Sequence, residues 1–497
     1  MVFPHTFRTE HSETRTTSSM YGEYYVRTRK KKIKIQPELL KVIRSIDFNR
    51  MSFLKNLEEI ISIPSISGNL KYVDDIAKAI KLTENWMVKL GIKHECFEIG
   101  SYTLEDKKLM RPTIILGTLG NDSTKPTIGV YAHLDVKMTD KANWKTDPWS
   151  LTELDQRLYG CGVASGKGTL MSWFNLIIAF QNIKMSLPVN LKFIIQSLHY
   201  YNSEGFEDFI ARKRQGFLSD ITYIVICDSE WLGDKHPCLV YGSVGLLHFT
   251  CTMNKNDQSD RCMKEDMKKI FEKLHDGKGN VLIPEFNDYI KQITPDEESV
   301  YESIEDFDIE EVRDSLPEHQ KSWDKLKLLM SFWRLPSIFV EDTLECTCED
   351  GDKSKIKKNF IIKIVPRQIV DVTKDQIIQH FKNSCKDLGV QHKVDVQLTS
   401  ASRTWLEDIN SLNLEAARKA IIQIYKDDPN MIREDRDLKI VNTLSVISEK
   451  SILVLPLGDK HIRAGEDNEN MPKKNFYEGI KLLGAYLFQV AALLQKE

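Results

Sequence analysis

The sequence lacks the features that mark several large classes of protein. No apolar run approaches the ~20 residues that span a bilayer, and the N-terminus has no apolar core of a secretory signal. The 69 basic and 72 acidic side chains nearly cancel, leaving a net charge of −3 and no general attraction to nucleic acid or to an anionic membrane. We therefore expect neither nucleic acid nor membrane as a partner, and we expect a cytoplasmic protein.

The cysteines also lack an ordered pattern. Nine are scattered along 497 residues without any Cys-x-x-Cys pair, and Cys346-x-Cys348 is the only close couple. Disulfide scaffolds and zinc knots need tighter spacing. We interpret these residues as the reduced thiols of a cytosolic protein.

The first 45 residues differ in composition from the rest of the chain. Residues 1–34 contain eight Lys or Arg and three Glu, a net charge of +5, and they are rich in Ser and Thr. We interpret residues 1–45 as a basic, flexible arm. A targeting peptide or an arm that docks on an anionic surface is the alternative, although the glutamates count against a transit peptide.

From about residue 46, helical and strand patterns alternate. Amphipathic spacing predicts helices over residues 51–61 and 73–90. Apolar runs predict strands at residues 113–117, 127–131, 191–197 and 221–227. This alternation predicts an α/β fold whose mostly parallel sheet has helices on both faces.

A change in pattern after Gly245 indicates a second domain. The chain becomes rich in charge and helical periodicity, including Glu305–Glu311, before the first pattern returns near the C-terminus. We predict a first domain of residues 46–245 and 425–497, and an inserted α+β domain of residues 246–424.

Polar side chains follow two of the predicted strands. His133 and Asp135 end one apolar run, and Asp228 follows another. The carboxyl ends of parallel strands meet at one edge of a sheet, and imidazole and carboxylate groups are zinc ligands. The sequence therefore places candidate metal ligands at this edge.

Many short motifs, in order from about residue 50 to the end, resemble one family. They are Tyr131–Val136, Trp144–Trp149, Leu158–Gly162, Ser203–Gly205, Trp231–Gly233, Gly279–Pro284, Asp306–Glu310, Leu455–Gly458 and Asn475–Gly479. The chain resembles the dinuclear-zinc metallopeptidases of the carnosine dipeptidase and cytosolic nonspecific dipeptidase type. The resemblance implies a zinc-exopeptidase-like fold, an inserted lid domain and a homodimer formed through the lid. A heterodimer with an active paralogue is a further form that it implies.

The resemblance also implies roles for individual positions. His133 matches a ligand of the first metal, Asp228 its terminal carboxylate, and Asp135 the carboxylate that orients the histidine. The remaining functional positions carry other residues. They are Ser165 for the bridging Asp, His199 for the base Glu, Tyr200 for a Glu ligand, Gly465 for a His ligand, Gln258 for a lid His and Lys363 for a substrate-clamping Arg. A backbone loop that would contact substrate reads Asp435-Arg436-Asp437.

Our leading hypothesis is a metallodipeptidase-like protein that has lost catalysis and acts as a binding or structural module. The cofactor would be one zinc or manganese ion, weakly bound or absent. A neutral hydroxyl at position 165 does not replace a carboxylate shared between two dications, and the base position holds His199 instead of a carboxylate.

Two alternatives stay open. An active metal-dependent dipeptidase or carboxypeptidase for short peptides would use one metal held by His133, Asp228 and His199. A sensor would bind peptides or amino acids in the old cleft without cleaving them. A shift of the C-terminal loop would instead bring His461 into the ligand position assigned to Gly465.

Overall fold

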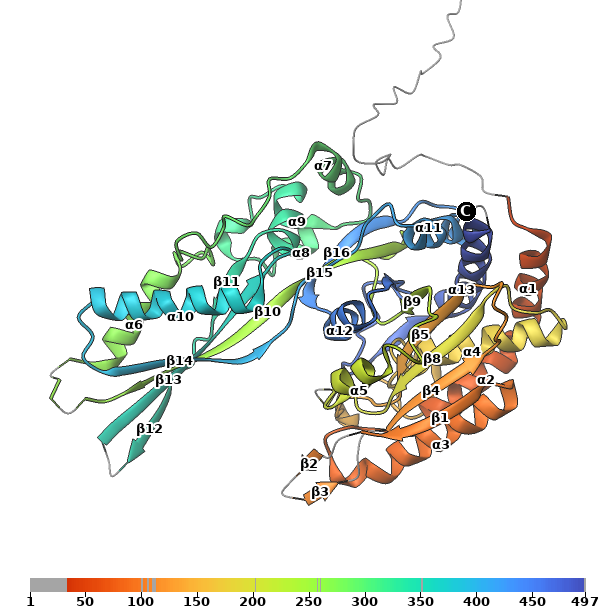
Figure 1. The fold of residues 1–497 in the computed structure, drawn as a ribbon, viewed down its shortest axis with the longest axis horizontal. Coiled ribbons are helices and arrows are strands. Elements are labelled where there is room, and N and C mark those ends of the chain that lie inside the picture. The colour runs from red at the N-terminus through yellow and green to blue at the C-terminus, as the bar shows by residue number, and fades with distance from the viewer. Residues whose placement is uncertain are drawn as a thin grey trace, which may run out of the picture.

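The computed structural model shows two lobes joined by a long strand (Figure 1). It describes residues 34–99, 102–104, 107–109, 113–201, 203–256, 258–259, 261–349 and 352–495. Most of the predicted arm, residues 1–33, therefore lies outside the described residues.

The larger lobe is built on a mixed sheet with a parallel centre. Its strands follow the order β1 (Lys93–Glu98), β4 (Thr113–Leu119), β8 (Asn190–Gln196), β5 (Thr127–His133), β9 (Tyr223–Ile226), β17 (Ser451–Val454) and β10 (Cys238–Asn254). The four strands from β8 to β17 run parallel, whereas β1, β4 and β10 are antiparallel to their neighbours on this path. Every residue of β5 and β8 is buried, as expected for strands covered on both faces.

Helices cover both faces of this sheet (Figure 1). One layer contains α1 (Pro37–Phe48), α2 (Arg50–Ile61), α3 (Val73–Leu90), α4 (Lys167–Asn182), α11 (Leu412–Tyr425) and α13 (Lys473–Leu494). The opposite face carries α5 (Phe206–Lys213) and α12 (Lys439–Ser448), which contact each other. The predicted α/β architecture is confirmed, with antiparallel strands added at the edges of the parallel centre.

A small antiparallel sheet brings the C-terminal region beside the turn that precedes α4. It consists of β6 (Thr152–Leu154), β7 (Arg157–Tyr159) and β18 (Asn470–Pro472). Tyr159 pairs with Asn470, so that residues 160–168 and 465–469 leave this sheet side by side. Elsewhere in this lobe, β2 (Tyr102–Leu104) and β3 (Lys107–Leu109) form a hairpin, and η1 (Leu70–Tyr72) and η2 (Lys141–Asn143) are short 3-10 helices.

The smaller lobe is the predicted lid. The first half of β10 pairs with β15 (Trp405–Leu406) and β16 (Asn430–Asp437), and its second half pairs with β13 (Asp352–Ile364) and β14 (Lys393–Ala401). Strands β11 (Ser337–Val340) and β12 (Glu345–Glu349) extend this sheet along β13. Helices α6 (Met263–Leu274) and α10 (Val370–Asp387) contribute side chains to a separate apolar core with the sheet.

The structure corrects three boundaries. Helix α1 begins at Pro37, inside the predicted arm, because Leu39, Val42 and Ile46 are fully buried against the main core. Helix α11 also packs in that core, so the main lobe resumes before residue 425. Within the segment expected to be helical over Glu305–Glu311, the chain is irregular until α8 (Ile309–Arg313).

The inserted domain is therefore divided between two cores. Its helical segment contains α7 (Pro295–Glu302), α8, η3 (Glu318–Gln320) and α9 (Lys325–Trp333). Val300, Tyr301, Leu329 and Trp333 from this segment belong to the core of the main lobe, not to that of the lid sheet. A seam consequently runs between the helical segment and the lid sheet.

Among the described residues, α13 alone is long and apolar enough to cross a membrane by length and composition. Most of this stretch, 72%, is buried inside the protein, and buried core helices pass the same test.

The burial of α1 predicts a sharp difference between two adjacent leucines. Leu39→Ala should lower the free energy of unfolding by about 2–5 kcal/mol, because Leu39 is fully buried and its removal leaves a cavity. Leu40→Ala, at a side chain 38% exposed, should change it by less than about 0.5 kcal/mol. Urea denaturation measures both; similar small values for the two would show that α1 does not belong to the core.

Candidate functional site

His133 is the last residue of β5, and its imidazole is fixed by the backbone that follows. Its Nδ1 lies 2.9 Å from the carbonyl oxygen of Asp135 and 3.5 Å from the Asp135 carboxylate. Because a carbonyl only accepts, Nδ1 carries the proton and Nε2 points elsewhere. Nε2 lies 3.7 Å from Oδ2 of Asp228, which follows β9. The structure thus brings His133, Asp135 and Asp228 together at the carboxyl ends of the parallel strands.

The Asp135 carboxylate also holds the loop after β8. One oxygen accepts a hydrogen bond from the backbone N–H of His199 and the other from that of Tyr200, each at 2.8 Å. The loop places the His199 ring over that of His133, with centroids 4.4 Å apart and planes 16° from parallel. Its Nδ1 lies 3.1 Å from the hydroxyl of Tyr131. His199 therefore faces Tyr131, and the structure does not bring it to Asp228 as a third ligand.

The two stacked imidazoles have opposite proton affinities. For His133, burial favours the neutral ring, but hydrogen bonding to Asp135 and the charge of Asp228 outweigh it and raise the pKa. Burial, with the neighbouring His133 second, lowers the pKa of His199 to about 3. His199 is therefore neutral at physiological pH.

A buried carboxylate organises the turn before α4. Glu469 is 1% exposed and accepts hydrogen bonds from the backbone N–H groups of Gly162, Ala164 and Ser165 at 2.8, 3.0 and 3.1 Å. The Ser165 hydroxyl donates a fourth, at 3.0 Å. Burial raises the pKa of Glu469, and these four bonds oppose that rise. The side chain at the bridging position thus points to Glu469.

Tyr200 joins this cluster and lies against Gly465. Its phenol hydrogen-bonds with the Ser165 side chain. A Cβ atom on Gly465 would lie 2.6 Å from the Tyr200 hydroxyl oxygen, closer than side chains approach each other. Gly465 also has φ +70°, a conformation that favours glycine. The structure therefore brings Ser165, Tyr200 and Gly465 into mutual contact, with Tyr200 filling the space that a side chain at 465 would enter.

Asp228 has one oxygen satisfied and one without a partner. Oδ1 accepts a hydrogen bond from the Gly166 N–H at 3.0 Å, whereas Oδ2 is buried and has no hydrogen-bond partner among the described residues. Gly166 itself touches His133, because a Cβ there would lie 2.5 Å from the His133 carbonyl oxygen and ring. A carboxylate side chain at position 166 is incompatible with this position of His133.

These contacts allow a test of whether a dinuclear metal centre fits. His133 Nε2 and the unpartnered Asp228 Oδ2 face each other and fit two positions of a single metal shell. Protein zinc sites use three or four protein ligands. No group of three or more His, Cys, Asp or Glu in the described part of the chain is placed to hold a metal ion. The second metal does not fit, since its three positions carry the Ser165–Tyr200–Gly465 contact.

The remaining candidate residues lie elsewhere. Gln258 is exposed on the lid after β10, and its N–H bonds to Asn256. Lys363, on β13, donates to the carbonyl oxygens of Ser331 and Phe332 at 2.6 and 3.2 Å, and burial lowers its pKa to about 8. His461 is half exposed and pairs with Asp234 at 3.1 Å, so the structure does not place it in the cluster.

Sequence reasoning used Glu469 only to align Gly465 and gave it no role. The available signal was an acidic residue beside an apolar strand, which needs a partner when buried. That the partner would be the turn 162–165 depends on the pairing of β7 with β18, more than 300 residues apart.

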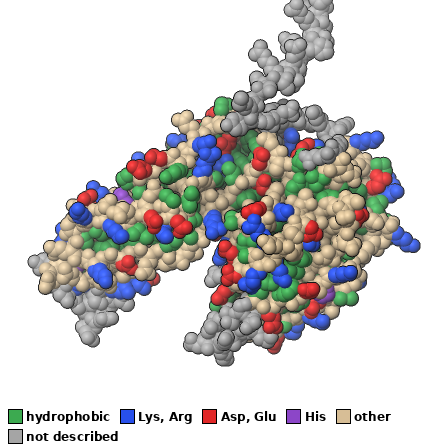
Figure 2. Space-filling view, viewed as in Figure 1, with side chains coloured by type: hydrophobic (Ala, Val, Ile, Leu, Met, Phe, Trp, Pro, Cys, Tyr) green, Lys and Arg blue, Asp and Glu red, His purple; other side chains and the backbone are tan. Residues whose placement is uncertain are grey.

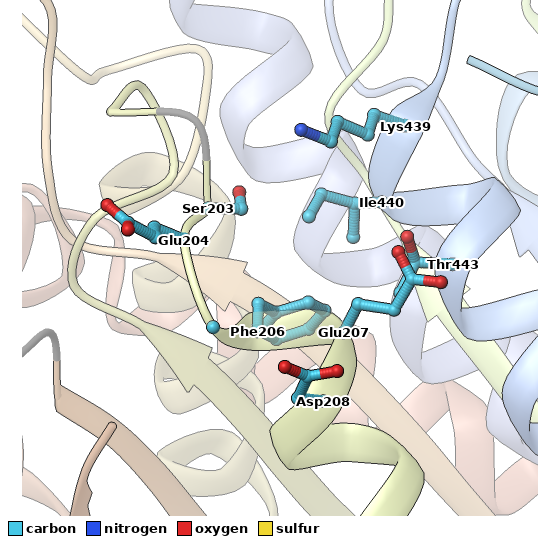
Figure 3. Close-up of a pocket in the computed structure, with 9 residues that line it drawn as sticks. Ser203, Glu204, Phe206, Glu207, Asp208, Lys439, Ile440 and Thr443 are labelled. Atoms are coloured by element: carbon cyan, nitrogen blue, oxygen red, sulfur yellow. The ribbon is translucent and has the colours of Figure 1, made fainter. Parts of the chain in front are cut away.

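A cavity of about 290 Å³ opens beside the loop that carries His199 and Tyr200 (Figure 3). Its walls come from the start of α5, the preceding loop and the start of α12. Glu204, Glu207 and Asp208 line it together with Lys439 (Figure 3). The first two acidic positions of α5 also complement the helix dipole, so these charges need no ligand to explain them.

Comparison with known proteins agrees with this geometry at the level of the family. The model of "Peptidase family M20/M25/M40" matches residues 129–489. The chain is 31% identical to the Beta-Ala-His dipeptidase of Rattus norvegicus over 473 residues, which cover 92% of this chain and 96% of the rat protein. It is 27% identical to the Cys-Gly metallodipeptidase dug1 of Schizosaccharomyces pombe over 470 residues, or 91% and 98% of the two chains.

Two solved structures show the same likeness. The crystal structure of human carnosine dipeptidase 1 superposes with a TM-score of 0.78 at 29% identity and covers 92% of this chain and 99% of its own. Dug1p of Saccharomyces cerevisiae, described as a di-peptidase, gives a TM-score of 0.77 at 25% identity, with 91% and 98% covered.

The contact between Tyr200 and Gly465 predicts the stability of three variants. Gly91→Ala serves as the control, because Gly91 has φ +74° and no atom within 4 Å of a new Cβ. It should lower the free energy of unfolding by about 1–2 kcal/mol. Gly465→Ala should lower it further, by about 1–3 kcal/mol, since its Cβ meets the Tyr200 hydroxyl.

Adding Tyr200→Phe to Gly465→Ala should recover part of that loss, as seen in a double-mutant cycle by urea denaturation. Equal costs for Gly91→Ala and Gly465→Ala would contradict this packing.

Proposed function

Because the chain belongs to peptidase family M20/M25/M40, we propose that it keeps the fold of a metal-dependent dipeptidase without its hydrolytic chemistry and acts as a binding or structural module. The observation that carries this proposal is the position of the Tyr200 hydroxyl, in the space that a side chain on Gly465 would need. A catalytic pair of metals must share a bridging ligand and be held on both sides. Ser165, Tyr200 and Gly465 supply no such ligands.

The position of the general base supports the same proposal. A base must reach the water or proton that it activates within hydrogen-bond distance. The Nδ1 of His199 lies within that distance of the Tyr131 hydroxyl, and its ring face is covered by the ring of His133. No atom of His199 is directed by these contacts toward Asp228.

The lysine at the clamp position is also engaged. Two of the three N–H donors of Lys363 point to the last carbonyl oxygens of α9. Two charged residues, Asp435 and Arg436, occupy exposed positions where the resemblance expects an uncharged backbone loop. Both differences alter the surface that would receive a short peptide.

An active enzyme with a single metal is the second candidate. The unpartnered Oδ2 of Asp228, 3.7 Å from His133 Nε2, favours it. In this form one zinc or manganese ion held by these two atoms would acidify a bound water, and His133 would stay oriented by Asp135.

We further propose a homodimer formed through the lid in the cytoplasm, with short peptides as the class of ligand that the cleft retains. A heterodimer with an active paralogue is the alternative form. The likeness to dipeptidases over nearly the whole chain supports these assignments.

Hydrolysis and metal content test the proposal together. With zinc or manganese added, turnover of β-alanyl-histidine and cysteinyl-glycine should be at least about a thousandfold below that of human carnosine dipeptidase assayed in parallel. The purified protein should hold far less than one equivalent of either metal after dialysis. Turnover that chelation and His133→Ala both abolish would overturn the proposal, and one tightly held equivalent would favour the single-metal enzyme.

Rebuilding the missing ligands provides a second test. The variant S165D/Y200E/G465H restores two carboxylates and an imidazole and removes the phenol that blocks position 465. It should bind more zinc than the wild type and gain thermal stability when zinc is added. The matched control S165D/G465H keeps Tyr200 and should gain neither, because the phenol still obstructs the new side chain.

A further inference from the structure

A second cavity, of about 380 Å³, lies in the seam between the lid sheet and the helical segment. Its walls come from the loop after α6, from η3 and the turn that follows it, from the end of α9 and from strands β11 and β13. All of its lining residues fall between positions 278 and 363, so it is separate from the cluster around His133 and Glu469. Cavities of this size at domain seams are typical of small-molecule sites.

The charges that line this cavity have one sign. Lys278, His319 and Lys363 line it, and no Asp or Glu does. The cavity in Figure 3 differs, since three carboxylates line it. Lys363 has no carboxylate within ion-pair distance among the described residues, and its bonds to the α9 carbonyl oxygens leave one N–H of the ammonium available. A partly buried ammonium without a counter-ion favours an anionic ligand.

The remaining walls are largely apolar. Trp323, Phe332, Leu335 and Pro336 contribute the aromatic and aliphatic surface. Lys327 lies 4.4 Å from the centre of the Trp323 ring, and His319 meets that ring edge-on at 5.9 Å. These contacts hold the indole in place beside the cavity, which suits a ligand with a flat apolar group.

We propose that this cavity binds a small organic carboxylate, with its anionic end at Lys363 and its flat apolar end along Trp323 and Phe332. A carboxylate fits better than a phosphate, because Lys363 offers one remaining donor and phosphate groups take several. The lowered pKa of Lys363, caused by burial, would rise again on binding. The site would stabilise the seam, since a ligand there contacts both the lid sheet and the helical segment.

Hydrocinnamate is a suitable probe, because it has no bond that a peptidase cleaves. Calorimetric titration of the full chain should give a dissociation constant on the order of 0.1–1 mM. The neutral amide hydrocinnamamide should bind about ten- to a hundredfold more weakly. Phenethylamine should not bind. Equal binding of the acid and its amide, or tighter binding of phenethyl phosphate than of hydrocinnamate, would overturn the proposal.

Three variants locate the site. Lys363→Met should weaken hydrocinnamate binding by about ten- to a hundredfold, whereas Lys358→Met, on the same strand but outside the cavity, should leave it unchanged. Trp323→Phe should remove the fluorescence change caused by the ligand. If Lys363→Met does not fold, the comparison of acid and amide on the wild type still decides.

His133→Ala should leave this binding unchanged. The result is therefore independent of the proposal on hydrolysis. Loss of binding in His133→Ala would place the ligand in the main cleft and overturn the assignment to the seam.

Discussion

The buried Glu469 carboxylate is the interaction on which the site depends. A carboxylate out of contact with water requires several hydrogen bonds, and Glu469 obtains four from one turn, Gly162–Ser165. These bonds fix the backbone before α4, direct the Ser165 hydroxyl inward and hold segment 465–469 beside it. The small sheet of β6, β7 and β18 supports the same arrangement from below, because Tyr159 and Asn470 are paired there.

Three residue exchanges at the ancestral second-metal position form one packing unit. Tyr200 needs the absence of a side chain at Gly465, and its hydroxyl finds a partner in Ser165, which Glu469 also engages. Each residue alone resembles neutral drift, whereas together they fill a space and satisfy their own hydrogen bonds. By contrast, His133, Asp135 and Asp228 keep the arrangement expected of a first-metal position, including an unpartnered carboxylate oxygen.

The lid is less uniform than a single inserted domain. Glu297 of α7 binds both Arg334 and Arg433, and both arginines are at least nine-tenths buried. This ion cluster and the apolar residues of α7 and α9 attach the helical segment to strand β16 of the main lobe. The lid sheet has its own core around Phe249 and Phe360, which are stacked 5.1 Å apart. The cavity lined by Lys363 results from that division.

The sequence by itself determined the α/β class, the strands that end at His133 and Asp228, and the family, because hydrophobic periodicity and short motifs are local. It placed the start of α1 and the return to the main lobe wrongly, since the burial of Leu39 and of α11 depends on distant partners. Only the tertiary structure decided that His199 faces Tyr131, that His461 pairs with Asp234 and that Tyr200 meets Gly465. These contacts join residues far apart in the chain, and residue type alone does not specify the direction in which a side chain points.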